Sequence, residues 1–136
     1  MRILAVDYGE RRTGLAVTDE LGITAHGLET IEVDDETALP GLVANVAKEK
    51  EAEKIIVGLP LNMNGTESIQ TKKVRAFASE LENECSLPVI FWDERMTSLQ
   101  AKRIMREMEK KTYGNKHHID RISATLILQN YMKTIV

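Results

Sequence analysis

The chain of 136 residues carries 18 basic and 21 acidic residues, a formal net charge of −3, and 43% of its residues are hydrophobic. This ordinary globular composition excludes a disordered or collagen-like chain, and a single cysteine, Cys85, excludes an internal disulfide and a multi-cysteine metal site. The length predicts one domain over residues 1–136. Because no apolar run approaches the roughly 20 residues that span a bilayer, we expect a cytoplasmic protein with no membrane contact.

The small net charge hides an asymmetry along the chain. Residues 1–68 have a net charge of −7, whereas residues 69–136 have a net charge of +4. A basic segment of this kind can attract a polyanion although the whole chain is acidic. The alternative is a solvated helix face, since Glu107 and Glu109 interrupt the basic run.

The first part of the chain predicts three strands followed by a helix. Residues 2–7 form an apolar run that ends in an acid, which is typical of a strand buried on both faces. Residues 13–19 predict a second strand, and a third is expected to end near Val33. A helix is predicted over residues 40–51, where a proline suits the first turn.

The remainder alternates apolar runs with helical patterns. We predict strands at 54–60 and 88–92, and helices from a Thr66 cap to about residue 84, from a Thr97 cap through residues 99–108, and at 119–133. Right-handed crossovers between these elements build a five-stranded mixed α/β sheet with helices on both faces. The carboxyl ends of its parallel strands are the natural place for a site.

Acidic side chains stand where several predicted elements reach that edge. Asp7 ends the first strand, and a carboxylate at the rim of a buried strand is costly unless water, a cation or hydrogen-bond donors reach it. Asp93 and Glu94 end the fifth strand. Because neighbouring residues point to opposite sides of a sheet, only one of them can face Asp7, and the sequence leaves both as candidates. Asp120 lies near the start of the last helix, where the helix dipole favours negative charge.

Acids from a first strand, a later strand end and a final helix are suited to one or two divalent cations. Mg²⁺ and Mn²⁺ prefer carboxylate oxygens. Two such ions about 4 Å apart activate a water for in-line attack on a phosphodiester and stabilise the leaving oxygen. The pattern therefore predicts a metal-dependent enzyme that hydrolyses nucleic acid.

Basic and hydroxyl residues near these acids predict contacts to phosphates. Arg11 and Arg12 lie in the first turn, where either can meet a phosphate or pair with Glu94. Further groups expected around the phosphates are Arg95, Thr97, Ser98 and Lys116. Because aromatic residues make up only 4% of the chain, we expect no base-stacking platform and recognition mainly by shape.

Four short motifs, in this order, resemble the YqgF family, which is also called RuvX. They are Asp7-Tyr8-Gly9 with Arg12 and Gly14, Val57-Gly58-Leu59-Pro60 with Asn64-Gly65, Asp93-Glu94-Arg95 with Thr97-Ser98, and Asp120 with Ser123-Ala124 and Ile127-Leu128. The resemblance covers essentially the whole chain.

This resemblance implies an RNase H-like fold, with strand order 3-2-1-4-5 and strand 2 antiparallel. It also implies a bacterial cytoplasmic nuclease, proposed for maturation of the 5′ end of pre-16S ribosomal RNA in ribosome biogenesis. The implied catalytic acids are Asp7, Glu94 and Asp120, with Asp93 adjacent, and the first three are the implied ligands of Mg²⁺ or Mn²⁺. One feature departs from the wider fold, because many RNase H-like nucleases carry an acid just after the fourth strand, where this chain reads Gly58-Leu59-Pro60-Leu61-Asn62 and has no carboxylate.

Three alternatives remain open from the sequence. The family's other description, Holliday-junction-resolvase-like, implies a four-way DNA junction as the substrate and favours a two-fold homodimer, whereas trimming one RNA end needs only a monomer. A non-catalytic RNA-binding assembly factor agrees with the missing acid. The Asp-x-Gly turn is also similar to the phosphate loop of actin-type ATPases, although those enzymes close two such domains around the nucleotide.

Overall fold

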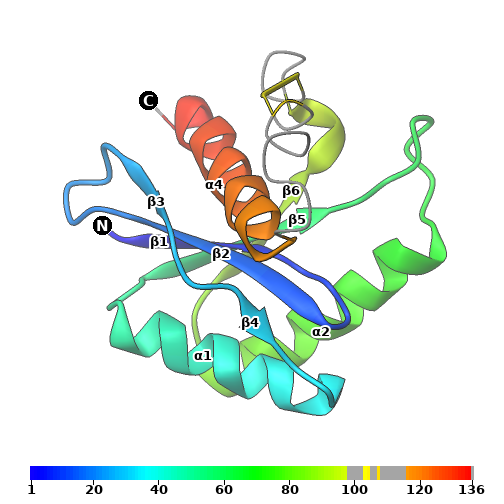
Figure 1. The fold of residues 1–136 in the computed structure, drawn as a ribbon, viewed down its shortest axis with the longest axis horizontal. Helices are drawn as coiled ribbons and strands as arrows, with labels where there is room; N and C mark the ends of the chain where they lie inside the picture. The colour runs from blue at the N-terminus through cyan, green and yellow to red at the C-terminus, as the bar shows by residue number, and fades with distance from the viewer. Residues whose placement is uncertain (98–102, 105–106, 108–115, 136) are drawn as a thin grey trace.

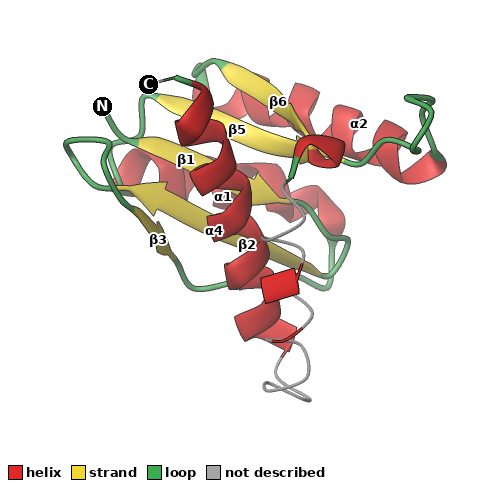
Figure 2. Ribbon diagram, turned by 90° about the horizontal axis from the view of Figure 1, so that it is seen from above, coloured by secondary structure: helices red, strands yellow, loops and turns green. Residues whose placement is uncertain are grey.

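A computed structural model of the chain describes residues 1–97, 103–104, 107 and 116–135, and shows a mixed sheet covered by helices on both faces (Figures 1 and 2). The strands are β1 (Ile3–Asp7), β2 (Arg12–Thr18), β3 (Ala25–Gly27), β4 (Ile31–Glu32), β5 (Lys54–Leu59) and β6 (Val89–Asp93). The helices are η1 (Glu36–Ala38), α1 (Leu39–Glu49), α2 (Ile69–Cys85), η2 (Glu94–Met96) and α4 (Lys116–Thr134). The helix predicted through residues 99–108 lies largely outside the described residues.

The central part of the sheet has the predicted topology. Its main path runs β3-β2-β1-β5-β6, in which β2 is antiparallel to β1, while β5 is parallel to both β1 and β6. The carboxyl ends of β1, β5 and β6 therefore meet at one edge of the sheet. None of the helices within the described ranges has the length and apolar character needed to cross a membrane.

The predicted count of five strands is wrong, because the third strand is split in two. β3 pairs with the end of β2 and β4 pairs with its start, which makes six strands. Between them, the carbonyl of Leu28 accepts a hydrogen bond of 2.9 Å from Nε of Arg121 on α4. The Arg121 side chain thus forms a hydrogen bond with a backbone carbonyl that lies between the two short strands.

Alternation along the strands sends apolar side chains to two separate cores. On one face α1 and α2 pack against a core that includes Leu4, Val6 and Ile55. On the other face α4 packs against a smaller core that includes Ala5 and Ile56. Figure 2 shows α4 lying across its face of the sheet.

Helix α2 begins two residues later than the predicted Thr66 cap. The cap is Ser68, whose Oγ accepts a hydrogen bond from the Thr71 amide while the Thr71 hydroxyl accepts one from the Ser68 amide. This reciprocal pair is a capping box. Thr66 instead donates from its amide and its hydroxyl to Oδ1 of Asn64 in the preceding loop.

Helix α4 approaches the sheet most closely at Gly14. A Cβ atom on Gly14 would overlap the backbone carbonyl of Asp120. Gly14 is also the register partner of Asp7 across the β1–β2 ladder. The missing side chain therefore allows the start of α4 to lie directly beside the end of β1.

We expect Gly14→Ala to destabilise the protein by about 1–3 kcal/mol, because backbone on both sides of the contact must move. The matched control is Gly41→Ala in α1, where no heavy atom lies within 4 Å of the added Cβ. That control should raise the free energy of unfolding by about 0.5–1 kcal/mol. Urea denaturation measures both values, and equal effects of the two substitutions would contradict a close approach at Gly14.

Candidate active site

Asp7, Glu94 and Asp120 meet at the carboxyl edge of the parallel strands. Asp7 is the last residue of β1, and Glu94 is the first residue after β6. Asp120 lies in the second turn of α4, whose backbone covers Gly14, the strand partner of Asp7. Three segments that are distant in sequence thus bring their carboxylates to one place.

A second glycine makes room for Glu94. A Cβ atom on Gly58 of β5 would lie 3.3 Å from Cδ of Glu94 and 2.8 Å from Cδ1 of Ile127. The Glu94 side chain therefore lies over β5, in the space beside Gly58. Here β5 carries no acid of its own, so the carboxylate beside this strand comes from the residue that follows the neighbouring strand.

Burial and neighbouring charge raise the pKa of Asp7 from 3.8 to about 7. Loss of solvent is the largest cause, followed by the negative charges of Glu94 and Asp120, while a hydrogen bond from Ser123 acts in the opposite direction. Burial, and then the charge of Asp93, also raise the pKa of Glu94. The cluster therefore has an excess of negative charge that a bound cation would relieve.

The side chain of Arg12 contacts this cluster directly. Nε of Arg12 donates to Oδ2 of Asp120 at 3.2 Å, and both side chains are partly buried. The sequence suggested Glu94 as an ion-pair partner for Arg11 or Arg12, but the partner of Arg12 is Asp120. Arg11 is exposed on the same turn.

Asp93 and Arg95 bind each other at the end of β6. Nε and Nη2 of Arg95 donate to both carboxylate oxygens of Asp93 at 2.7–3.1 Å, and the Arg95 amide donates to Oδ1. These hydrogen bonds lower the pKa of Asp93. Of the two adjacent acids, Glu94 is the one whose charge acts on Asp7. The guanidinium of Arg95 is thus engaged within the protein.

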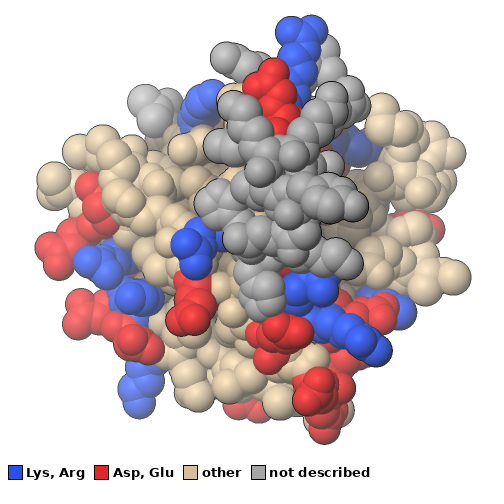
Figure 3. Space-filling view, in the orientation of Figure 1, with Lys and Arg blue, Asp and Glu red and all other residues tan. Residues whose placement is uncertain are grey.

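The other predicted phosphate contacts are only partly described. The Thr97 amide donates to the Glu94 carbonyl at 3.2 Å and so closes η2. Ser98 lies outside the described residues, and Lys116 is described only as the first residue of α4. On the face drawn in Figure 3, acidic and basic side chains of the described residues are interspersed.

The donor chemistry of the site fits a hard divalent cation. Asp7, Glu94 and Asp120 offer carboxylate oxygens, and among the described residues no positive side chain lowers the pKa of Asp7. In this arrangement, however, no three Asp, Glu, His or Cys side chains among the described residues are grouped closely enough to hold one ion. The Asp120 carboxylate forms an ion pair with Arg12. A metal site with three carboxylates therefore requires Asp120 to leave Arg12 and bind the ion.

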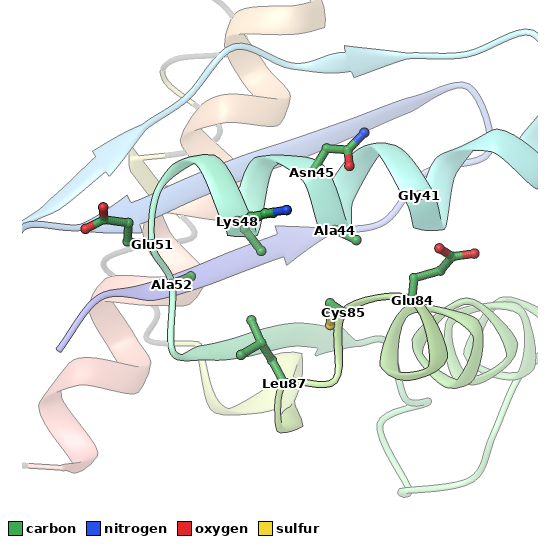
Figure 4. A pocket seen from close by; sticks show the side chains of 10 residues that line it. Gly41, Ala44, Asn45, Lys48, Glu51, Ala52, Glu84, Cys85 and Leu87 are labelled. Carbon is green, nitrogen blue, oxygen red and sulfur yellow. The ribbon is translucent and has the colours of Figure 1, made fainter.

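A pocket elsewhere in the molecule is separate from these acids. It has a volume of about 670 Å³ and lies between α1 and the end of α2 (Figure 4). Ala52 and Leu87, which line it, precede β5 and β6. The pocket is therefore at the amino-terminal edge of the parallel strands, opposite the carboxylates.

Comparison with known proteins identifies the family. A model of the RuvX family, described as Holliday junction resolvase, matches residues 1–134. The chain belongs to the RuvX family. A relative from Koribacter versatilis (strain Ellin345), named "Putative pre-16S rRNA nuclease", is 46% identical over 97% of this chain and 86% of its own length. A relative of the same name from Syntrophus aciditrophicus (strain SB) is 42% identical over 99% of this chain and 90% of its own length.

Solved structures show the fold of this RuvX-family chain. The RuvC resolvase of T. thermophilus, solved in complex with a Holliday junction substrate, superposes with a TM-score of 0.66 and 16% identity, covering 100% of this chain and 97% of that one. The fowlpox virus Holliday junction resolvase superposes with a TM-score of 0.59 and 14% identity, covering both chains completely. These likenesses confirm the expected RNase H-like fold.

Sequence reasoning missed two kinds of residue in the RuvX-family site. Gly14 and Gly58 were given no function, although a glycine inside a strand often marks a close approach of another segment. Ser123 appeared only as part of a motif, yet its hydrogen bond lowers the pKa of Asp7. The sequence signal for Ser123 is its position one turn after Asp120 on the last helix.

We expect stability to depend on pH through Asp7 when no divalent cation is present. Because the folded pKa of about 7 lies above the ordinary value of 3.8, the stabilising effect of the bound proton is complete below pH 3.8 and is lost as the pH rises to 7. Asp7→Asn should therefore match the parent at pH 4 and exceed its free energy of unfolding at pH 8 by up to about 4 kcal/mol.

Chemical denaturation in EDTA at several pH values measures this difference. The control is Glu84→Gln, which changes an exposed carboxylate at the opposite edge of the sheet and should change the free energy of unfolding by less than about 0.5 kcal/mol. A difference between Asp7→Asn and the parent that does not change between pH 4 and pH 8 would contradict the raised pKa.

Proposed function

We propose that this protein is a Mg²⁺- or Mn²⁺-dependent endonuclease that hydrolyses phosphodiester bonds in processing the 5′ end of pre-16S rRNA. In this proposal residues 1–136 act as a single domain in the cytoplasm. The observation that carries the proposal is the half-buried carboxylate of Asp7, flanked by Glu94 and Asp120 at the carboxyl edge of an RNase H-like sheet. The names of the relatives from K. versatilis and S. aciditrophicus support pre-16S rRNA as the substrate.

Asp7 and Glu94 would hold the metal ion, and Asp120 would join them. A divalent cation bound there supplies an activated water and stabilises negative charge on the leaving oxygen. Asp7 would bind the cation as a carboxylate, and would therefore give up the proton that its raised pKa retains near neutral pH. The hydroxyl of Ser123 holds the Asp7 carboxylate through its hydrogen bond.

Arg12 has two partners in this mechanism. In the structure its guanidinium neutralises Asp120. When a cation takes that role, Arg12 is placed beside the site to bind a phosphate of the substrate. Arg11, exposed on the same turn, is the second candidate for a phosphate contact, and Thr97, Ser98 and Lys116 stay predictions. We assign Asp93 to positioning Arg95, because both of its carboxylate oxygens accept from that side chain.

Resolution of four-way DNA junctions is the second candidate. It is favoured by the description of the RuvX family and by the likeness of the fold to RuvC-type resolvases. Symmetric cleavage of a junction would require two copies of the site, hence a homodimer. Processing of one RNA end requires only a monomer.

We expect the purified protein to cleave a structured RNA that contains the 5′ pre-16S segment in Mg²⁺ or Mn²⁺, and Asp7→Asn to lower the rate at least about 100-fold. Asp7→Asn removes a carboxylate that would bind the cation. A loss of this size is usual when a metal ligand or its direct support is removed. Gel analysis of end-labelled RNA measures the rate, with a four-way DNA junction assayed in parallel.

The matched control for this experiment is Glu84→Gln, which also replaces a carboxylate by an amide, on the surface at the opposite edge of the sheet, and should keep the full rate. Symmetric nicking of the junction without RNA cleavage would replace the RNA proposal with the resolvase. Cleavage that persists in Asp7→Asn would show a contaminating nuclease, and binding of RNA without any cleavage would favour a non-catalytic assembly factor.

A further inference from the structure

The loop between β5 and α2 projects from the body of the protein in two perpendicular views (Figures 1 and 2). It starts directly after β5, at the same edge of the sheet as Asp7 and Glu94. Its tip carries Met63, whose exposed fraction of 83% is unusual for a large apolar side chain. An apolar group is thus displayed to solvent next to a strongly polar site.

Internal hydrogen bonds hold this loop in one shape. A β-bridge joins Leu61 to Glu67, and the Asn62 amide donates to the Thr66 carbonyl at 2.9 Å. The side-chain amide of Asn62 donates to the Thr66 hydroxyl at 2.9 Å. Gly65 turns the chain with a φ of 86°, and its amide donates to the Asn62 carbonyl at 2.8 Å. These hydrogen bonds close the hairpin and thereby keep Met63 exposed at its tip.

Arg95 ties the tip of the loop to the active site. Its Nη1 donates to the Met63 carbonyl at 3.2 Å, while Asp93 holds the rest of the same guanidinium. The side chain also packs against Gly65, where an added Cβ would lie 3.3 Å from Nη1. Arg95 directly follows Glu94 in the sequence. Its side chain reaches from the backbone next to this acid to the backbone carbonyl of Met63.

The chemistry of the loop suits bases better than phosphates. Residues 61–66 read Leu-Asn-Met-Asn-Gly-Thr and contain no charged side chain. Phosphates are usually contacted by basic side chains, whereas bases are contacted by apolar surfaces and amide groups. Methionine is among the apolar side chains that proteins insert between base steps. A neutral hairpin with an apolar tip is thus complementary to an exposed base.

We propose that Met63, held in place by Arg95, contacts an unpaired or unstacked base of the nucleic acid next to the bond that is cleaved. This inference rests on the proposed function and adds to it a preference for substrates in which paired and unpaired regions meet. Arg95 acts here as a positioning residue for the loop, which replaces the direct phosphate contact expected for it from the sequence.

Binding measurements in the Asp7→Asn protein test the inference without cleavage. Two RNA probes have equal numbers of phosphates; one is a hairpin with an unpaired 5′ extension, and the other is fully paired. We expect Met63→Ala in this background to weaken binding of the extended hairpin about tenfold, as for the loss of contact with one base, and to change binding of the paired probe less than about twofold. Fluorescence anisotropy at one salt concentration gives both dissociation constants.

Two further variants control this experiment. Met63→Leu keeps an apolar tip and should restore the preference for the extended hairpin. Ile23→Ala removes another exposed apolar side chain, in the turn before β3, and should affect neither probe. An Arg95→Gln variant should show the same selective loss as Met63→Ala, since it releases the tip.

The outcomes separate the two proposals. If Met63→Ala weakens both probes equally, or neither, the role of the loop is overturned and the proposed nuclease function is not affected. If the Asp7→Asn protein binds neither RNA probe, both the proposed function and the loop's role are overturned. An equal loss for both probes in Arg95→Gln would show a direct phosphate contact and overturn its role as a positioning residue.

Discussion

The partial burial of one carboxylate beside two others is the constraint on which the rest of the site depends. Asp7 ends a strand that is otherwise buried, and the charges of Glu94 and Asp120 add to the cost of its ionisation. A group in that position is stable only if it keeps a proton or receives a cation. Arg12 already supplies one positive charge at Asp120. The divalent ion that we propose for this site would offset the remaining negative charge.

Two glycines make this cluster geometrically possible. Gly14 lets the backbone of α4 reach the strand beside Asp7, and Gly58 leaves room over β5 for the side chain of Glu94. The position of Glu94 over Gly58 concerns the acid that is missing after the fourth predicted strand, which is β5 in the structure. A carboxylate is still present at β5, but it comes from the residue after β6. The absence of an acid in the sequence of β5 is therefore weak evidence for an inactive protein.

The features that follow from local sequence were predictable, and those that depend on tertiary approach were not. The strand that ends at Asp7 and the helix that carries Asp120 follow from hydrophobic patterning, whereas the order and direction of the central strands follow from the resemblance to the RuvX family. The choice between Asp93 and Glu94 could not be made, because it depends on how the chain turns into η2. The split third strand depends on Arg121 of a distant helix. Likewise, Ser68 and Thr66 are both good caps, and only the shape of the preceding loop decides between them.

We propose that Asp7 exchanges a proton for a metal ion. Calorimetric titration with Mn²⁺ at pH 6, repeated in two buffers of different ionisation enthalpy, measures the protons released on binding. Because the pKa of Asp7 is about 7, we expect the parent protein to release up to one proton per bound ion. Asp7→Asn should bind more weakly and release fewer protons. Equal affinity and equal proton release in the two proteins, or no binding by the parent, would show that Asp7 does not make this exchange.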